Sequence, residues 1–285
     1  MSTPGAAPCP DPQIISVRRR DLLPYLRADP VGHVQSLYMC LAAPDAEAEA
    51  LPGGPGGTLS GFLLGGGPPL AGINPLAARL HVTSLAAAGP LALHWWRSGA
   101  GTDRARYLAL PVWVEGAVRA ALPEDAAAWS TDSRACCTPH DFRPPAVDHE
   151  VLWVDRSNAG ALRLPPGWEA DLPAPGGEDL CASVRSGGVI VARACSYVQT
   201  MEIGYVQRVE TLPAYRRRGF AATAVAAVTR ALFHRHKAAV AYHYDETNVA
   251  SASTCRALGF RVHGRVAIVT RRPAEGVPGG SGERG

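Results

Sequence analysis

The stretch Val209-Glu-Thr-Leu-Pro-Ala-Tyr-Arg-Arg-Arg-Gly-Phe-Ala221 decides the fold of this chain. It places a strand end, a short basic loop and a helix start in direct succession. The first turn of a helix leaves N–H groups unpaired, and the helix dipole adds positive charge there. The positive end of the dipole disfavours the cationic side chains of Arg216 to Arg218 at this position. We therefore expect a bound anion to compensate their charge. We predict that a phosphate or pyrophosphate binds the N–H groups of residues 218–222, which it can approach past Gly219 and Ala221.

The pattern around this stretch predicts a mixed α/β sheet. Residues 216–218 could instead form a solvated arginine cluster. The succession of strand, loop and helix around them favours the anion site. Alternation predicts strands, and three- and four-residue spacing predicts helices. The expected strands are 188–199, 201–211, 238–244 and 265–270, and the expected helices are 219–237 and 248–258.

The N-terminal region is expected to form a second, smaller α/β lobe. Helical spacing covers residues 29–41, and residues 112–122 alternate too little for a strand and are expected to be helical. Short strands are expected at 59–64 and 80–84, and residues 91–96 fit a strand or a helix start. The Pro-rich break at residues 143–145 places the domain boundary near residue 148. We therefore expect an N-terminal lobe at 12–147, a second domain at 148–272 and a disordered tail at 273–285.

Composition limits the classes of partner. Hydrophobic residues make up 47% and the net charge is +3, so no global basic field points to nucleic acid or to a membrane. Residues 1–12 do not resemble a secretory signal, and no apolar run approaches the length of about 20 residues that spans a bilayer. The seven cysteines form no C-x-x-C pattern. We expect free thiols, no metal site and a cytoplasmic location.

Two motifs carry a resemblance to a known family. Arg216-x-x-Gly219-x-Ala221 resembles the acyl-CoA signature Q/R-x-x-G-x-G/A of the GNAT acetyltransferase superfamily. Asn248-x-x-Ser251, followed by Leu258-Gly-Phe260, resembles the helix that packs beside the cofactor in that superfamily. The resemblance covers about 120 residues and implies a mixed, mostly antiparallel sheet flanked by helices. The N-terminal lobe is similar to a degenerate half of the same fold.

The resemblance implies a set of cofactor-binding residues for acetyl-CoA. The strand end would offer backbone groups to the pantetheine arm, the basic loop would hold the pyrophosphate, and the second helix would approach the thioester. An N-cap is the alternative role for the asparagine that heads this helix. The predicted cofactor-binding residues are Val209, Thr211, Arg216, Arg217, Arg218, Gly219, Phe220, Ala221, Asn248 and Ser251.

The catalytic residues are less evident. Glu210 is the predicted general base, because a carboxylate at the strand end can take a proton from an amine; a surface ion pair with an arginine is the alternative. Cys255 stands where many family members carry a tyrosine acid. A thiol can donate a proton, but a small buried cysteine is more often packing. Tyr242, Tyr244 or water are the alternatives for the acid.

Together, these features predict an acyl-CoA-dependent N-acyltransferase that acts on an amine of a small molecule or peptide, as a monomer or homodimer. The alternative function is a CoA-binding sensor or interaction module without catalysis. Nucleic-acid binding through the triplets at Arg18 and Arg216 would need a wider basic and aromatic surface. The identity of the acceptor is not encoded in any readable motif.

Overall fold

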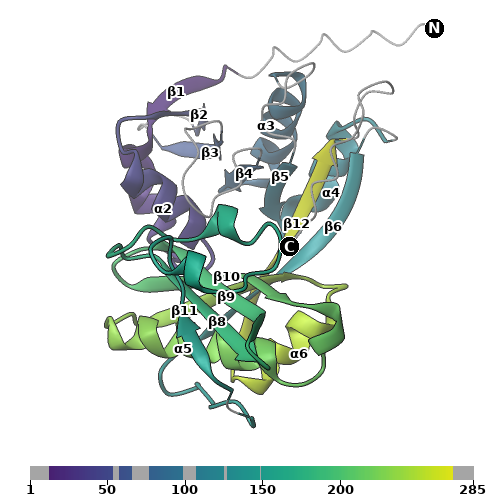
Figure 1. Ribbon diagram of the computed structural model, residues 1–285. Helices are drawn as coiled ribbons and strands as arrows, with labels where there is room; N and C mark the ends of the chain where they lie inside the picture. The colour runs from purple at the N-terminus through teal and green to yellow at the C-terminus, as the bar shows by residue number, and fades with distance from the viewer. Residues whose placement is uncertain are drawn as a thin grey trace, which may run out of the picture.

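The computed structural model describes residues 13–53, 58–65, 77–98, 107–124, 127–147 and 149–271, so the predicted tail at 273–285 lies outside the described residues. In these residues one sheet of twelve strands runs through two lobes, in the order β1-β2-β3-β4-β5-β12-β6-β11-β10-β9-β8-β7. Figure 1 shows the N-terminal lobe above the C-terminal lobe, with β6 and β12 running side by side between them. No helix within these ranges is long and apolar enough to cross a membrane.

The N-terminal lobe contains a two-helix segment, a meander of strands and two further helices. Its elements are β1 (Ile15–Arg18), η1 (Arg19–Leu22), α1 (Leu23–Leu26), α2 (Val34–Ala42), β2 (Glu47–Pro52), β3 (Leu59–Leu64), β4 (Ala77–Val82), α3 (Leu85–Ser98), β5 (Tyr107–Pro111), η2 (Val112–Val114), α4 (Glu115–Ala121) and β6 (Ala127–Cys137).

The C-terminal lobe begins with a short strand and two 3-10 turns. Its elements are β7 (Val151–Trp153), η3 (Ala159–Ala161), η4 (Glu169–Asp171), β8 (Leu180–Ser186), β9 (Val189–Gln199), β10 (Ile203–Thr211), η5 (Pro213–Tyr215), α5 (Phe220–His234), β11 (Ala239–Asp245), α6 (Val249–Ala257) and β12 (Arg261–Arg271).

The two lobes repeat one six-strand unit. Strands β1 to β5 and strands β7 to β11 each form a meander whose last pair is parallel, β4 with β5 and β10 with β11. A helix connects each parallel pair, α3 in the first lobe and α5 in the second. The N-terminal lobe is therefore a second copy of the C-terminal topology. No repeat of fixed period is evident in the sequence, because the loops of the two copies differ in length.

The last strand of each unit is exchanged between the lobes. Strand β6 pairs with β11 of the other lobe, with Cys137 opposite Val240, and β12 pairs with β5, with Leu110 opposite Ala267. The exchanged strands also pair with each other over most of their length. Along the chain, the first unit ends with β6 at Cys137 and the second begins with β7 at Val151, while the sheet continues from one unit to the other.

Helix α5 covers one face of the C-terminal sheet. Its apolar stripe, which includes Ala224, Val228 and Leu232, is fully buried against β8, β10 and β11. Gly204 of β10 permits this close approach, because a Cβ there would lie 2.6 Å from a terminal carbon of Leu232. The opposite face near the start of β10 and β11 packs on α1 and α2 of the first lobe.

The observed elements agree with most of the sequence predictions. The predicted strands at 188–199 and 201–211 are β9 and β10, and the turn between them uses the Thr200 hydroxyl, which accepts a 3.1 Å bond from the Ile203 amide. Residues 91–96, left open between strand and helix, belong to α3. Residues 19–22 form a 3-10 turn without a side-chain cap.

Candidate active site

The sheet opens between β10 and β11. Their parallel pairing ends at Val206 opposite Tyr242, and β10 then continues to Thr211 alone on that side. Two register shifts against β9 bend this part of β10, and Arg208 takes the left-handed backbone conformation, with φ of 51°. Backbone groups of residues 207–211 therefore face a gap in the ladder where an extended ligand can pair.

The helix that follows this gap begins without an internal cap. Gly219 is the N-cap residue of α5, with φ of 84°, and no side chain accepts from the first turn. Within the described residues, the backbone amides of Arg217 to Ala222 donate no hydrogen bond to another protein group. We call these amides the amide cradle. Unpaired amides at a helix N-terminus form an anion site.

The three arginines surround the amide cradle. Arg216 is anchored to the strand end, since its Nε donates a 3.2 Å bond to the Thr211 carbonyl. The Arg218 guanidinium lies over the ring of Phe220, 5.2 Å from its centre. All three arginines are exposed, and none forms an ion pair with a described carboxylate. Their charge is therefore available to a ligand.

A segment that the sequence analysis missed borders the amide cradle. His149 Nε2 donates a 3.0 Å bond to the Arg218 carbonyl, and its ring lies 4.1 Å from that of Phe220. The Thr223 hydroxyl donates to the Val147 carbonyl at 3.0 Å. These contacts fix the loop before the helix. No local sequence motif predicts these contacts, because they join residues about 70 positions apart.

Glu210 lies on β10 within a charged cluster. Arg193 of β9 donates to Glu210 Oε1 from both Nη2, at 2.7 Å, and Nε, at 3.3 Å. The Arg193 side chain is only 3% exposed, whereas that of Glu210 is 31% exposed. Asp171 completes the cluster at 3.4 Å from Arg193. Glu210 is thus paired with an arginine, as one alternative predicted, and its second oxygen has no partner among the described residues.

Cys255 packs in the hydrophobic core. It is 1% exposed and lies in the cluster under α5 and α6, beside Leu258 and Phe260. Burial raises the pKa of its thiol well above the ordinary value. A thiol in this position neither reaches the opening nor yields its proton readily, so the packing alternative describes it and we assign it no chemical role.

Two tyrosines lie on β11 close to the opening. Tyr242 is buried and donates a 3.3 Å hydrogen bond to Ser251 Oγ, and burial raises the pKa of its phenol. Tyr244 lies where β11 no longer pairs with β10 and pairs only with β6, opposite Ser133. It is partly exposed, with its ring 6.2 Å from that of Tyr242. Tyr244 is therefore the tyrosine that can meet a ligand in the gap.

The second predicted motif forms a capped helix. Asn248 is the N-cap of α6, and its Oδ1 accepts a 3.1 Å bond from the Ser251 amide, which is the alternative role given above. Ser251 lies one turn into the helix and contacts Tyr242. Val209 packs against the core under α5, and the Thr211 hydroxyl is buried without a partner. A role for these residues in holding a cofactor stays a prediction.

A mixed sheet that opens between two parallel strands beside an uncapped helix N-terminus defines the fold of the GCN5-related N-acetyltransferases. Three solved structures show this likeness, and at their low identities the likeness is one of fold. A GCN5-related N-acetyltransferase from Sphaerobacter thermophilus is 14% identical, with a TM-score of 0.59 over 90% of this chain and 94% of that one. A GCN5-related N-acetyltransferase-like protein from Streptococcus suis is 15% identical, with a TM-score of 0.53 over 86% and 99%. A GCN5-related N-acetyltransferase from Kribbella flavida is 18% identical, with a TM-score of 0.51 over 69% and 82%.

The family comparison is confined to the C-terminal lobe. Residues 187–268 match the family model described as FR47-like protein. This range runs from the turn before β9 into β12 and contains both motifs that carried the resemblance. No curated protein matches the sequence. Two structures align with about nine-tenths of this chain, so the likeness in fold extends over both lobes.

Proposed function

We propose that the protein is an acyl-CoA-dependent N-acyltransferase that uses acetyl-CoA and an amine of a small molecule or peptide. The amide cradle carries this proposal, because its unpaired amides lie directly beside the opening between β10 and β11. A nucleotide thioester has an anionic head and an extended arm. The helix N-terminus can bind the head, and the free edge of β10 can bind the arm, so one continuous surface can hold the whole molecule.

The amide cradle holds the pyrophosphate in this proposal, and the exposed arginines beside it add charge. The backbone groups of Val209 and Thr211 pair with the pantetheine arm, as a neighbouring strand would. This arrangement brings the acyl carbon to the bent part of β10, close to Glu210. Binding the acyl donor and the amine together supplies much of the rate by proximity.

Glu210 serves as the general base. Its Oε1 is engaged by Arg193, which leaves Oε2 to accept a proton from the protonated amine, directly or through a water molecule. The neutral amine nitrogen then attacks the acyl carbon, a C–N bond forms, the C–S bond breaks, and the nitrogen releases its second proton to water. Arg193 orients the carboxylate, and Trp168 orients Arg193 by accepting a 3.0 Å bond at its carbonyl.

Tyr244 serves as the acid that protonates the departing thiolate. It lies on β11 across the gap from the free part of β10, and its side chain is accessible, unlike those of Tyr242 and Cys255. A phenol can donate a proton to a thiolate as the C–S bond breaks. The proton lost by the amine and the proton gained by the thiol thus use different residues.

A CoA-binding sensor without catalysis is the second candidate, and the burial of Cys255 is the observation that favours it. The two functions separate in one experiment. Calorimetry should first show binding of acetyl-CoA, and a thiol-release assay with a panel of amines and peptides should then show free CoA. Binding without release by any amine would favour the sensor, and absence of binding would refute both functions.

A further inference from the structure

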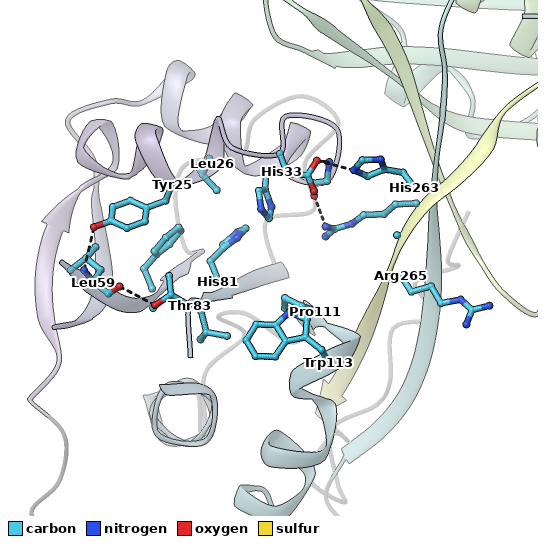
Figure 2. A pocket seen from close by; sticks show the side chains of 17 residues that line it. Tyr25, Leu26, His33, Leu59, His81, Thr83, Pro111, Trp113, His263 and Arg265 are labelled. Carbon is cyan, nitrogen blue, oxygen red and sulfur yellow. Dashed lines mark hydrogen bonds and ion pairs between the residues drawn. The ribbon is translucent and has the colours of Figure 1, made fainter. Parts of the chain in front are cut away.

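A cavity of about 300 Å³ lies in the N-terminal lobe, at the lower end of the size range of small-molecule sites. Figure 2 shows it between Tyr25 and His33 of the α1–α2 segment, the ends of β3 and β4, Trp113, and His263 of the exchanged strand β12. The pairing of β4 with β5 stops at Arg79 opposite Ala109, before this cavity. By the repeat of the two units, it occupies the place that the β10–β11 opening occupies in the other lobe.

Two guanidinium groups lie beside this cavity without an ion-pair partner among the described residues. Arg134 of β6 lines it, and the Arg134 Nε is buried without a partner. Arg79 of β4, 6% exposed, is not among the lining residues. Within the described residues it donates hydrogen bonds to the neutral Gln35, at 2.7 Å, and to Met39 Sδ, at 3.5 Å. Neither arginine has a carboxylate within ion-pair distance in the parts of the chain that the structure describes. Buried charges normally have a counter-charge.

Both arginines stay charged at neutral pH. Burial lowers the pKa of Arg79 to about 10, and burial together with the nearby Arg79 lowers that of Arg134 to about 10. The one described carboxylate that lines the cavity is already engaged. Asp29 accepts bonds from His263 Nε2, at 2.8 Å, and from the Gly32 amide, at 2.9 Å. Arg134 Nη1 donates a hydrogen bond to the Gly32 carbonyl, and the charges of Asp29 and Asp132 raise the pKa of Arg134. Neither carboxylate forms an ion pair with Arg134, so its guanidinium can still pair with an anion in the cavity.

Two of the three histidines that line the cavity, His33 and His81, add polarity without adding charge there. Burial lowers the pKa of His33, and burial lowers that of His81 well below the ordinary value, so both rings are neutral. His81 hydrogen bonds Ser36 at 2.9 Å, whereas His33 Nδ1 is buried without a partner. His33 Nδ1 and Arg134 Nε are thus two unpartnered polar atoms on the side chains of residues that line one space.

The remaining walls are aromatic. The ring of Phe62 stacks on His81, with centres 4.8 Å apart, and Tyr25 meets Phe62 edge to face at 6.0 Å. Trp113 stands at the rim and is 56% exposed, which is unusual for so large an apolar side chain. A flat apolar body fits between such rings.

We propose that this cavity is a binding site for a small carboxylate with a flat apolar body, held by a charge-assisted hydrogen bond to Arg134. The planar guanidinium matches a carboxylate, while the rings of Tyr25, Phe62 and Trp113 cover the rest of the ligand. This site is separate from the amide cradle and has its own occupant. The strand exchange builds one wall of this site, because β12 pairs with β5 and supplies His263 and Arg265 to the lining.

Binding of phenylacetate, benzoate and indole-3-acetate to the full chain tests the proposal, by calorimetry and ligand-observed NMR. At least one of these acids is expected to bind, and its neutral amide is expected to bind about tenfold more weakly or worse, because the amide lacks the charge. Saturating acetyl-CoA should leave the affinity unchanged. Equal affinity for acid and amide, binding of none of the three acids, or displacement by acetyl-CoA would each overturn the proposal.

The variants Arg134→Met and Arg265→Met locate the site. Arg134→Met should lose at least about tenfold in affinity for the acid. It should still fold, because replacing a buried charge by an apolar group is often neutral or stabilising. Arg265 also lines the cavity, but it pairs with Glu246 at 2.7 Å and points away from the rings in Figure 2, so its loss should change little. Arg134→Lys, which keeps the charge, should bind with intermediate affinity. Equal loss in Arg134→Met and Arg265→Met would refute the role of Arg134.

Discussion

Arg193 and Glu210 form an ion pair across β9 and β10, with 2.7 Å between Arg193 Nη2 and Glu210 Oε1. The arginine is almost completely buried, while the carboxylate reaches the surface of the opening. This difference in exposure divides their roles. Arg193 belongs to the framework of the C-terminal lobe, and Glu210 is the member of the pair that a ligand can meet.

Glu210→Gln should reduce the rate of acyl transfer by about 10²- to 10⁴-fold, the usual effect of removing a general base. The affinity for acetyl-CoA should stay unchanged, since no part of the amide cradle is altered. Single-turnover kinetics and calorimetry measure the two quantities. A matched control is Asp171→Asn, which removes the other carboxylate of the cluster at 3.4 Å from Arg193. If both variants lose activity equally, the cluster acts as a support and Glu210 is not the base.

Gly219→Val should weaken acetyl-CoA binding strongly and leave the protein folded. The backbone at residue 219 is left-handed, which costs a residue other than glycine about 1–2 kcal/mol. There is enough room for a side chain at residue 219, because a Cβ there would lie 3.6 Å from His149 and Val147. Gly188→Val is the matched control. Residue 188 has φ of 80° in the turn before β9, with nothing within 4 Å of a Cβ. Equal affinity for acetyl-CoA in both variants would contradict the position of the pyrophosphate.

Tyr244→Phe should lower the rate of acyl transfer, whereas Tyr242→Phe should lower the stability. The first variant removes the phenol that reaches the opening. The second removes a buried hydrogen bond to Ser251 and should cost about 1 kcal/mol in urea unfolding. Cys255→Ala should retain the wild-type rate, because that thiol is enclosed by the core. A rate loss in Cys255→Ala alone would restore the cysteine as the acid.

The free energy of unfolding should fall as the pH drops below about 6.5. Burial, then the charges of His33, Arg134 and Arg79, lower the pKa of His81 well below its ordinary 6.5. As the pH falls, the unfolded chain therefore binds a proton at His81 at a higher pH than the folded chain does. The contribution of His81 to the free energy of unfolding is fully present above the ordinary pKa. Stability decreases towards acid by up to about 1.4 kcal/mol per pH unit for each such histidine. Urea unfolding between pH 7 and 5 measures this slope. His81→Gln should flatten it, and an unchanged slope would contradict a neutral buried His81.

The C-terminal lobe could be predicted from the sequence because its signals are local. The strand, loop and helix around Gly219 are contiguous, and the Asn248 cap lies at the head of its own helix. The strand exchange could not be predicted, since Ala127–Cys137 shows no clean alternation and its partners are more than 100 residues away. The sequence around Arg134 likewise does not indicate that this side chain is buried. Its environment is created by α1, β4 and β12 together.

The exchange of β6 and β12 has a consequence for biosynthesis. Strand β5 ends at Pro111, but the strand that covers its free side starts only at Arg261. While the ribosome makes the intervening segment, the nascent N-terminal half carries an open sheet edge, which is prone to pair with other chains. A premature stop before Arg261 would leave that edge exposed permanently, so the first lobe is completed only after the strands of the second unit have been translated.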